Sequence, residues 1–189
     1  YGVSFTEGIV TTLQDIRSIE LRVKELGVEA HIEVTPLCVS RISARKRQMT
    51  ARTGCGICGL DSLSDVVREQ AKIDYEFDIV EASIDRALKD SGLLQVMNQR
   101  TGGAHAAFFV SSDGEILLTR EDVGRHVALD KLIGAMLQKG IDPRAGFILT
   151  TSRASFEMVQ KAVAVGVGLL VTMSAPTSMA INLARKMQI

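Results

Sequence analysis

The chain has 189 residues, which is long enough to bury a hydrophobic core without disulfide bonds. Its 22 Lys and Arg residues balance 22 Asp and Glu residues, so no overall charge draws it to nucleic acid or to an anionic membrane surface. The three cysteines argue against a secreted disulfide framework and favour a reducing cytoplasm.

Neither a membrane span nor an export leader is indicated. The longest apolar stretch, residues 162–173, is too short to cross a bilayer and is interrupted by glycines. The chain opens at Tyr1 without a charged and then apolar leader, so we expect no export and a trimmed amino terminus.

Alternating apolar and charged residues predict a β-hairpin near the amino terminus. Apolar residues occupy every second position from Ile19 to Val23 and again from Val28 to Val34, with Gly27 between the two runs. The alternation predicts two half-buried strands. Cys38, which follows them, is expected to be a small buried apolar residue.

A basic run leads directly into a pair of cysteines. The segment SRISARKRQMTAR, residues 40–52, is expected on a helix and contains no acidic residue; its cations are Arg41, Arg45, Lys46, Arg47 and Arg52. Such a run is usually a solvated helix face. Here it ends just before RTGCGICGL, in which Cys55 and Cys58 lie three positions apart among glycines.

This cysteine pair could serve as zinc ligands, as a redox pair or as a nucleophile that carries a group. A structural zinc site needs four ligands, whereas this segment offers one pair of cysteines. A zinc deaminase needs His-x-Glu followed by Pro-Cys-x-x-Cys. Here His105 comes after the cysteines and is followed by two alanines. A thioredoxin-type pair would begin a helix, which the glycines disfavour. A loop nucleophile that carries a group fits best, because the neighbouring cations would lower the pKa of a cysteine thiol.

The second part of the chain alternates strands and helices. Helices are predicted in residues 77–92 and in the segment that ends at Gly102 and Gly103, followed by a strand hairpin, AHAAFFV and EILLTR, around SSDG. Two further strands, GFILTT and GLLVTM, are separated by single helices, which predicts parallel pairing and a three-layer α/β sandwich. We place a boundary near residue 75, with an N-terminal lobe at 1–75 that carries the cysteines and an α/β domain at 76–189.

The helices that follow these strands suggest an anion site. Glu121 and Asp122 are expected at the positive end of a helix in REDVGRHVALDKLIG, which also places His126 and Asp130 one turn apart. Helix starts that follow parallel strands gather at one edge of a sheet, where backbone N–H groups can hold phosphates. Arg125 and Arg153 would add fixed positive charge at this edge. His105 lies at a strand start beside two glycines, where the backbone can approach a ligand closely.

Several unusual blocks occur together in a fixed order. RTGCGICGL, TGGAHAAFF, REDVGRHVALDKLIG, SRASFEMVQK and SAPTSMA resemble segments of the formate dehydrogenase accessory proteins of the FdhD/NarQ family, and the opening GVSFTEGIV resembles their N-terminal region. The resemblance spans nearly the whole chain. It implies a homodimeric cytoplasmic protein with a cytidine-deaminase-like core and a smaller N-terminal lobe that contains β-structure.

The resemblance also implies a function, sulfur transfer to a molybdenum cofactor. A cysteine desulfurase would load sulfane sulfur onto Cys55 as a persulfide, with Cys58 assisting or substituting. The recipient would be the molybdenum or tungsten of a bis(molybdopterin guanine dinucleotide) cofactor, a bound substrate that activates formate dehydrogenase. We assign His105, Arg125, His126 and Arg153 to cofactor binding and expect no structural metal, nucleic acid or membrane partner.

The family pattern continues beyond Ile189 into a further strand, a Gly-Phe turn and a short tail, so we expect part of the cofactor site to be absent from this chain. The alternative function is that of a non-catalytic escort that shelters the cofactor and uses its cysteines only as contacts or redox sensors.

Overall fold

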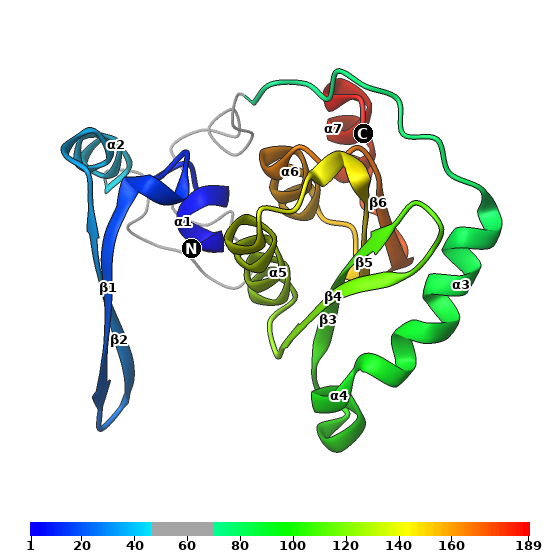
Figure 1. Ribbon diagram of the computed structural model, residues 1–189, viewed down its shortest axis with the longest axis horizontal. Coiled ribbons are helices and arrows are strands. Elements are labelled where there is room, and N and C mark those ends of the chain that lie inside the picture. The colour runs from blue at the N-terminus through cyan, green and yellow to red at the C-terminus, as the bar shows by residue number, and fades with distance from the viewer. Residues whose placement is uncertain (47–69) are drawn as a thin grey trace. The chain divides into compact units, whose positions relative to one another are not determined.

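The computed structural model describes residues 1–46 and 70–189, which belong to two units (Figure 1). The larger unit comprises Tyr1–Thr6 together with Arg68–Ile189, and the smaller unit is Glu7–Val67. The sequence placed the boundary near residue 75 and residues 1–75 in one lobe. A short helix that the sequence did not predict, α1 (Gly2–Thr6), packs instead on the helices of the larger unit.

The larger unit is built on a four-stranded sheet with the order β4-β3-β5-β6. Its strands are β3 (His105–Ser111), β4 (Ile116–Asp122), β5 (Gly146–Arg153) and β6 (Leu170–Ser174). Parallel pairing is confirmed for β5 and β6, and the predicted β3–β4 hairpin is confirmed as antiparallel. Pairing of β4 with β5 is wrong, because β3 lies between them and runs antiparallel to both. The β3–β4 hairpin reverses the chain, and α5 then connects β4 to β5 across β3. As a result β4, β5 and β6 all point the same way.

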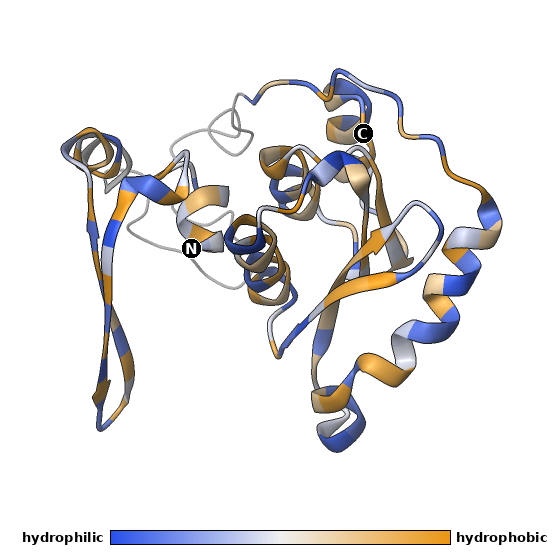
Figure 2. Ribbon diagram, in the orientation of Figure 1, coloured by the Kyte–Doolittle hydropathy of each residue, from blue (hydrophilic) through white to orange (hydrophobic). Residues whose placement is uncertain are grey.

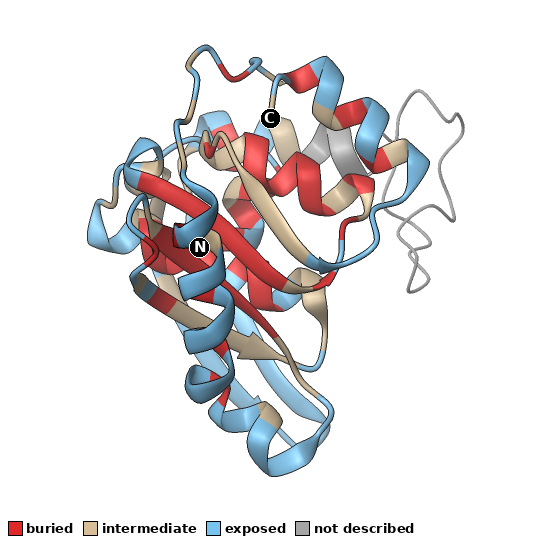
Figure 3. Ribbon diagram, turned by 90° about the vertical axis from the view of Figure 1, so that its right-hand side faces the viewer, coloured by how far each residue is buried: buried red, intermediate tan, exposed pale blue. Residues whose placement is uncertain are grey.

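Helices cover both faces of this sheet. One face packs against α5 (Arg125–Lys139) and α6 (Phe156–Val165), through a core that includes Phe109. The other face packs against α3 (Glu81–Ser91) and includes Phe108. Neighbouring residues of β3 serve opposite faces because side chains alternate along a strand. Figure 3 shows the resulting band of buried residues through the sheet.

The remaining helices of the larger unit are α4 (Val96–Thr101) and α7 (Ser178–Met187), the latter packed against α6. Burying each large aliphatic or aromatic side chain contributes about 1.5–3 kcal/mol, so the two core clusters dominate the stability of this unit. The predicted α/β class is confirmed. The cytidine-deaminase-like assignment stays a prediction.

Close packing joins α1 to α5 through two glycines. A Cβ atom on Gly2 would lie 1.7 Å from the carbonyl oxygen of Asp130, and one on Gly134 would lie 3.0 Å from the backbone nitrogen of Gly2. No side chain larger than hydrogen fits at Gly2. The close contact between α1 and α5 therefore requires glycine at position 2 for steric reasons.

The smaller unit contains the predicted hairpin, β1 (Ile16–Lys24) and β2 (Gly27–Val34), followed by α2 (Pro36–Lys46). The strands pair antiparallel, with Leu21 opposite Ala30 and Val23 opposite Val28. Figure 2 shows the alternation of hydrophobic and hydrophilic residues along both strands. The expectation of a half-buried hairpin is wrong: Leu21 is 67% exposed and Val23 is 84% exposed. Among the described residues, no third strand pairs with this two-stranded sheet.

Cys38 lies on α2 and is fully buried, as predicted. Within the described residues, no helix combines the length and apolar character needed to cross a membrane.

Candidate functional site

The carboxyl ends of three strands meet at one edge of the larger sheet. The helices α5, α6 and α7 begin shortly after β4, β5 and β6 respectively, and His105 opens the antiparallel β3 directly opposite Asp122. We call this region, from the ends of these strands to the first turns of the three helices and His105, the carboxyl edge. The predicted gathering of helix starts at one edge is confirmed by the strand directions.

Two arginines supply positive charge at the carboxyl edge that is unpaired within the described part of the chain. Arg125 is the first residue of α5, and Arg153 is the last residue of β5. Within residues 1–46 and 70–189, neither guanidinium has an ion pair, and the Nε atom of Arg125 is buried without a hydrogen-bond partner. A guanidinium presents a planar fork of donors that suits phosphate or carboxylate oxygens. The two arginines therefore remain available for an anionic ligand.

The nearby acidic side chains are all engaged. Asp122 forms an ion pair with Lys131, and Nε2 of His126 lies 2.7 Å from Oε2 of Glu157. The hydrogen bond from Lys131 holds the pKa of the Asp122 carboxyl below its ordinary value, which keeps it ionised at neutral pH. Because Lys131 neutralises Asp122, this carboxylate opposes an anion at Arg125 and Arg153 less than a free carboxylate would.

The expectation that Glu121 and Asp122 open a helix is wrong. Both residues belong to the last part of β4, and α5 begins three residues after Asp122, with Gly124 as its N-cap. The Glu121 carboxylate instead accepts hydrogen bonds from the backbone nitrogens of Met97 and Asn98, at 2.8 and 2.9 Å. It thus caps the first turn of α4.

Two of the three helix starts lack a side-chain cap. Neither Gly124, before α5, nor Ser155, before α6, caps its helix with a side chain, and the Ser155 hydroxyl is buried without a hydrogen-bond partner in the described part of the chain. By contrast, Thr177 accepts a hydrogen bond from the backbone nitrogen of Ala180 in α7. The first N–H groups of α5 and α6 can therefore bind an anion.

His105 is held by one residue of β5. Its Nδ1 atom lies 3.3 Å from the hydroxyl oxygen of Thr151, which also accepts a hydrogen bond of 3.0 Å from the backbone nitrogen of Ala106. Thr151 was not predicted as a site residue, because a threonine within the strand pattern GFILTT carries no signal of its own.

A polar seam continues from the carboxyl edge into the interior, between α5 and α6. The predicted His126 and Asp130 pair along one helix does not form; each residue pairs instead with α6, His126 with Glu157 and Asp130 with Lys161. Asp130 also accepts a 2.6 Å hydrogen bond from Thr6 of α1. The partners on α6 are four residues apart, like those on α5, and this shared spacing was the signal that could have found them.

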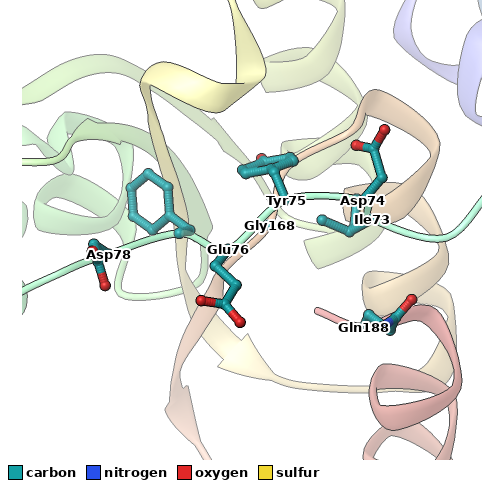
Figure 4. Close-up of a pocket in the computed structure, with 8 residues that line it drawn as sticks. Ile73, Asp74, Tyr75, Glu76, Asp78, Gly168 and Gln188 are labelled. Carbon is teal, nitrogen blue, oxygen red and sulfur yellow. The ribbon is translucent and has the colours of Figure 1, made fainter.

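A separate cavity of about 640 Å³ lies at the opposite edge of the sheet (Figure 4). It is lined by residues 73–78 together with Gly168 and Gln188. The Tyr75 hydroxyl donates a 2.9 Å hydrogen bond to the carbonyl of Gly166, and burial raises the pKa of this phenol. Three carboxylates line the cavity, Asp74, Glu76 and Asp78, so an anionic ligand is disfavoured there.

The predicted catalytic residues Cys55 and Cys58 lie outside the described residues, as do Arg47 and Arg52. In the ranges 1–46 and 70–189, no group of three or more His, Cys, Asp and Glu side chains could hold a metal ion. The structure thus brings together His105, Arg125, His126 and Arg153 at one edge. The role of each of them stays a prediction.

Similarity to known proteins shows the family to which this chain belongs. The family model described as FdhD/NarQ matches residues 1–189. A relative from Bordetella bronchiseptica named sulfur carrier protein FdhD is 43% identical over 185 residues, which cover 98% of this chain and 67% of the relative. A protein of the same name from Cupriavidus necator is 43% identical over 188 residues, covering 100% of this chain and 65% of the relative. The chain therefore spans about two thirds of the length of these relatives.

A solved structure shares the fold. The crystal structure described as a formate dehydrogenase accessory protein from Desulfotalea psychrophila matches with a TM-score of 0.67 and 19% identity, covering 98% of this chain and 66% of the other. The sequence match extends through both units and through the carboxyl edge. The chain belongs to the FdhD/NarQ family.

Proposed function

We propose that this protein is a sulfur carrier that accepts sulfane sulfur on Cys55 and delivers it to a metal cofactor bound at the carboxyl edge. The observation that carries the proposal is the 43% identity, over nearly the whole chain, to proteins named sulfur carrier protein FdhD. The donor is a cysteine desulfurase. The recipient is the molybdenum or tungsten of a bis(molybdopterin guanine dinucleotide) cofactor, held as a substrate.

The loading step is a thiol exchange. The Cys55 thiolate attacks the outer sulfur of the persulfide on the desulfurase, a new S–S bond forms, and the desulfurase cysteine leaves as a thiolate. The transferred sulfur keeps its oxidation state, so no external oxidant or reductant is required. The thiolate is the attacking form, and the cations that precede Cys55 in the sequence favour it. Cys58 assists or replaces Cys55.

The charge at the carboxyl edge supports a role in cofactor binding. A guanine dinucleotide carries a pyrophosphate group, which needs several N–H donors and positive charge. Arg125 and Arg153 are unpaired within the described residues, and the starts of α5 and α6 lack side-chain caps. His126, the second residue of α5, lies beside Arg125. These groups suit the diphosphate part of the cofactor rather than its metal.

Formate dehydrogenase is the proposed destination, because the similar crystal structure is described as a formate dehydrogenase accessory protein. The protein acts as a homodimer in the cytoplasm. The single pair of cysteines near the basic run suits a reducing compartment.

The direct test is the intact mass of the protein after incubation with a cysteine desulfurase and cysteine. We expect one added sulfur atom, about 32 Da, on wild type and on Cys38→Ala, and none on Cys55→Ala. Cys38 is the matched control because it is a fully buried cysteine on α2. Loading that persists in Cys55→Ala but is lost in Cys58→Ala would move the carrier role to Cys58.

A second measurement separates transfer from escort. A variant that lacks both Cys55 and Cys58 should bind the cofactor but fail to activate formate dehydrogenase. Full activation by this variant would support an escort that moves no sulfur.

A further inference from the structure

We infer that Thr151 is a positioning residue, which holds the proton of the neutral His105 ring on Nε2 so that the ring presents an N–H donor at the carboxyl edge. The ligand atom that fits this donor is an anionic or carbonyl oxygen, as in a phosphate. The choice of a phosphate ligand rests on the proposed function, whereas the proton position rests on the geometry alone.

Thr151 lies next to His105 just beyond the last printed pair of β3 and β5, Ala107 opposite Thr150. The regular pairing of β5 with β6 shifts between Thr150 and Arg153. Irregularities of this kind redirect side chains at the ends of strands and near binding sites. The Thr151 hydroxyl takes the place of a backbone carbonyl and accepts the N–H of Ala106 at 3.0 Å.

The hydroxyl has one remaining proton to donate. Nδ1 of His105, at 3.3 Å, is the acceptor that the described structure offers to this proton. A threonine hydroxyl is one donor and a double acceptor, so this arrangement uses both its donor and its acceptor capacity. If Nδ1 carried the ring proton instead, the hydroxyl would accept two N–H groups and its own proton would have no partner among the described residues. Hydrogen-bond satisfaction therefore favours the proton on Nε2.

The consequence concerns what His105 can bind. With Nδ1 acting as an acceptor, the neutral ring offers Nε2–H to a ligand, and Nε2 has no hydrogen-bond partner in the described structure. An N–H group donates to a phosphate oxygen but cannot coordinate a metal ion or accept a proton. His105 thus contributes to ligand recognition as a donor, and not as a metal ligand or a general base.

Hydrogen bonds from side chains also hold the backbone that leads to His105. The Glu121 carboxylate fixes the first turn of α4, and the side-chain oxygen of Asn98 in that turn accepts a 3.3 Å hydrogen bond from the backbone nitrogen of Ala104. Helix α4 ends at Gly102 with φ of 63°, a left-handed conformation that glycine adopts without strain. The chain therefore approaches His105 along a defined path, and its ring is oriented before a ligand binds.

The test compares ring tautomers in the full chain by ¹⁵N NMR of its histidines at pH about 8.5, above the ordinary imidazole pKa of about 6.5. We expect the Nε2–H form of His105 in wild type and in Thr151→Ser, which keeps the hydroxyl. In Thr151→Val, which keeps the shape but lacks the hydroxyl, we expect a mixture of tautomers.

The matched control is Thr150→Val, because the Thr150 hydroxyl is buried without a hydrogen-bond partner in the described structure. This control should leave the His105 tautomer unchanged. Wild type in the Nδ1–H form, or Thr151→Val with an unchanged Nε2–H signal, would overturn the inference.

Binding of guanosine diphosphate tests the ligand part separately. We expect roughly a 3- to 10-fold weaker affinity for Thr151→Val and recovery in Thr151→Ser, a loss typical of one weakened hydrogen bond. If the tautomers behave as expected but wild type binds no guanosine diphosphate, the positioning role stands and the proposed nucleotide site fails. If wild type binds and Thr151→Val binds equally well, His105 does not donate to this ligand.

Discussion

The polar seam between α5 and α6 allows a sharp prediction about stability. Lys161 donates to both carboxylate oxygens of Asp130, at 2.7 and 2.9 Å, and also donates to the hydroxyl of Thr6 at 3.1 Å. Asp130 and Lys161 are each only 8% exposed. The substitution Asp130→Asn removes the negative charge with little change in shape and takes away the carboxylate that Lys161 contacts through both oxygens.

The expected loss follows from this burial. Breaking a buried ion pair by neutralising one partner typically costs about 3–5 kcal/mol, whereas replacing both partners by neutral groups is often close to neutral. We therefore expect Asp130→Asn to lower the free energy of unfolding by about 3 kcal/mol or more. The double variant Asp130→Asn with Lys161→Met should recover most of this loss, because it removes the lysine charge together with the carboxylate that the lysine contacts.

The assay is urea unfolding of the full chain, followed by circular dichroism of its helices. The matched control is Lys131→Met on the same helix, whose ion pair with Asp122 is partly exposed, with 45% of the Lys131 side chain accessible. An exposed pair of this kind contributes about 0–1 kcal/mol. Equal losses for Asp130→Asn and Lys131→Met, or a double variant no more stable than Asp130→Asn, would refute the reasoning.

Three further predictions concern the carboxyl edge and the smaller unit. Arg125→Ala and Arg153→Ala should each weaken guanosine diphosphate binding roughly 10-fold by calorimetry, as expected for one charged hydrogen bond; unchanged affinity would place the nucleotide elsewhere. The backbone N–H of Thr11 lowers the Asp15 pKa to about 2. The stabilisation that ionised Asp15 gives to the start of β1 is therefore present above the unfolded pKa of about 3.9 and is lost as the pH falls through about 2. A carboxyl NMR titration with a midpoint near 4 would contradict this. Leu21→Ser should cost less than about 0.5 kcal/mol in urea unfolding because Leu21 is largely exposed, and a loss above about 2 kcal/mol would show that this face is covered.

The sequence predicted the helices and strands of the larger unit well because their signals are local. Helix α5 (Arg125–Lys139) begins within the segment REDVGRHVALDKLIG, where a helix was predicted, and α4 ends at Gly102 as expected. The gathering of Arg125, His126 and Arg153 at one edge could also be predicted, since it depends only on helices that follow strands pointing the same way. The buried state of Cys38 follows from its residue type.

Other features depend on contacts between distant segments. The position of β3 between β4 and β5 could not be predicted from the alternating strands and helices, because the helix that follows a hairpin can place the next strand beside either strand of the hairpin. Thr151 shows no local pattern, and Glu157 is indicated only by its four-residue spacing from Lys161; both acquire their roles only when β5 and α6 meet His105 and His126. The burial of the hairpin was mispredicted, because alternation shows only that a strand has one apolar and one polar face. It does not show that another element covers the apolar face.

The central claim is that Cys55 carries sulfur, and intact mass spectrometry of the desulfurase-treated protein tests it most directly. The account predicts a gain of about 32 Da that dithiothreitol removes, that maps to Cys55 after digestion and that is absent from Cys55→Ala. An unmodified wild-type protein, under conditions in which the desulfurase loads a known acceptor, would contradict the account.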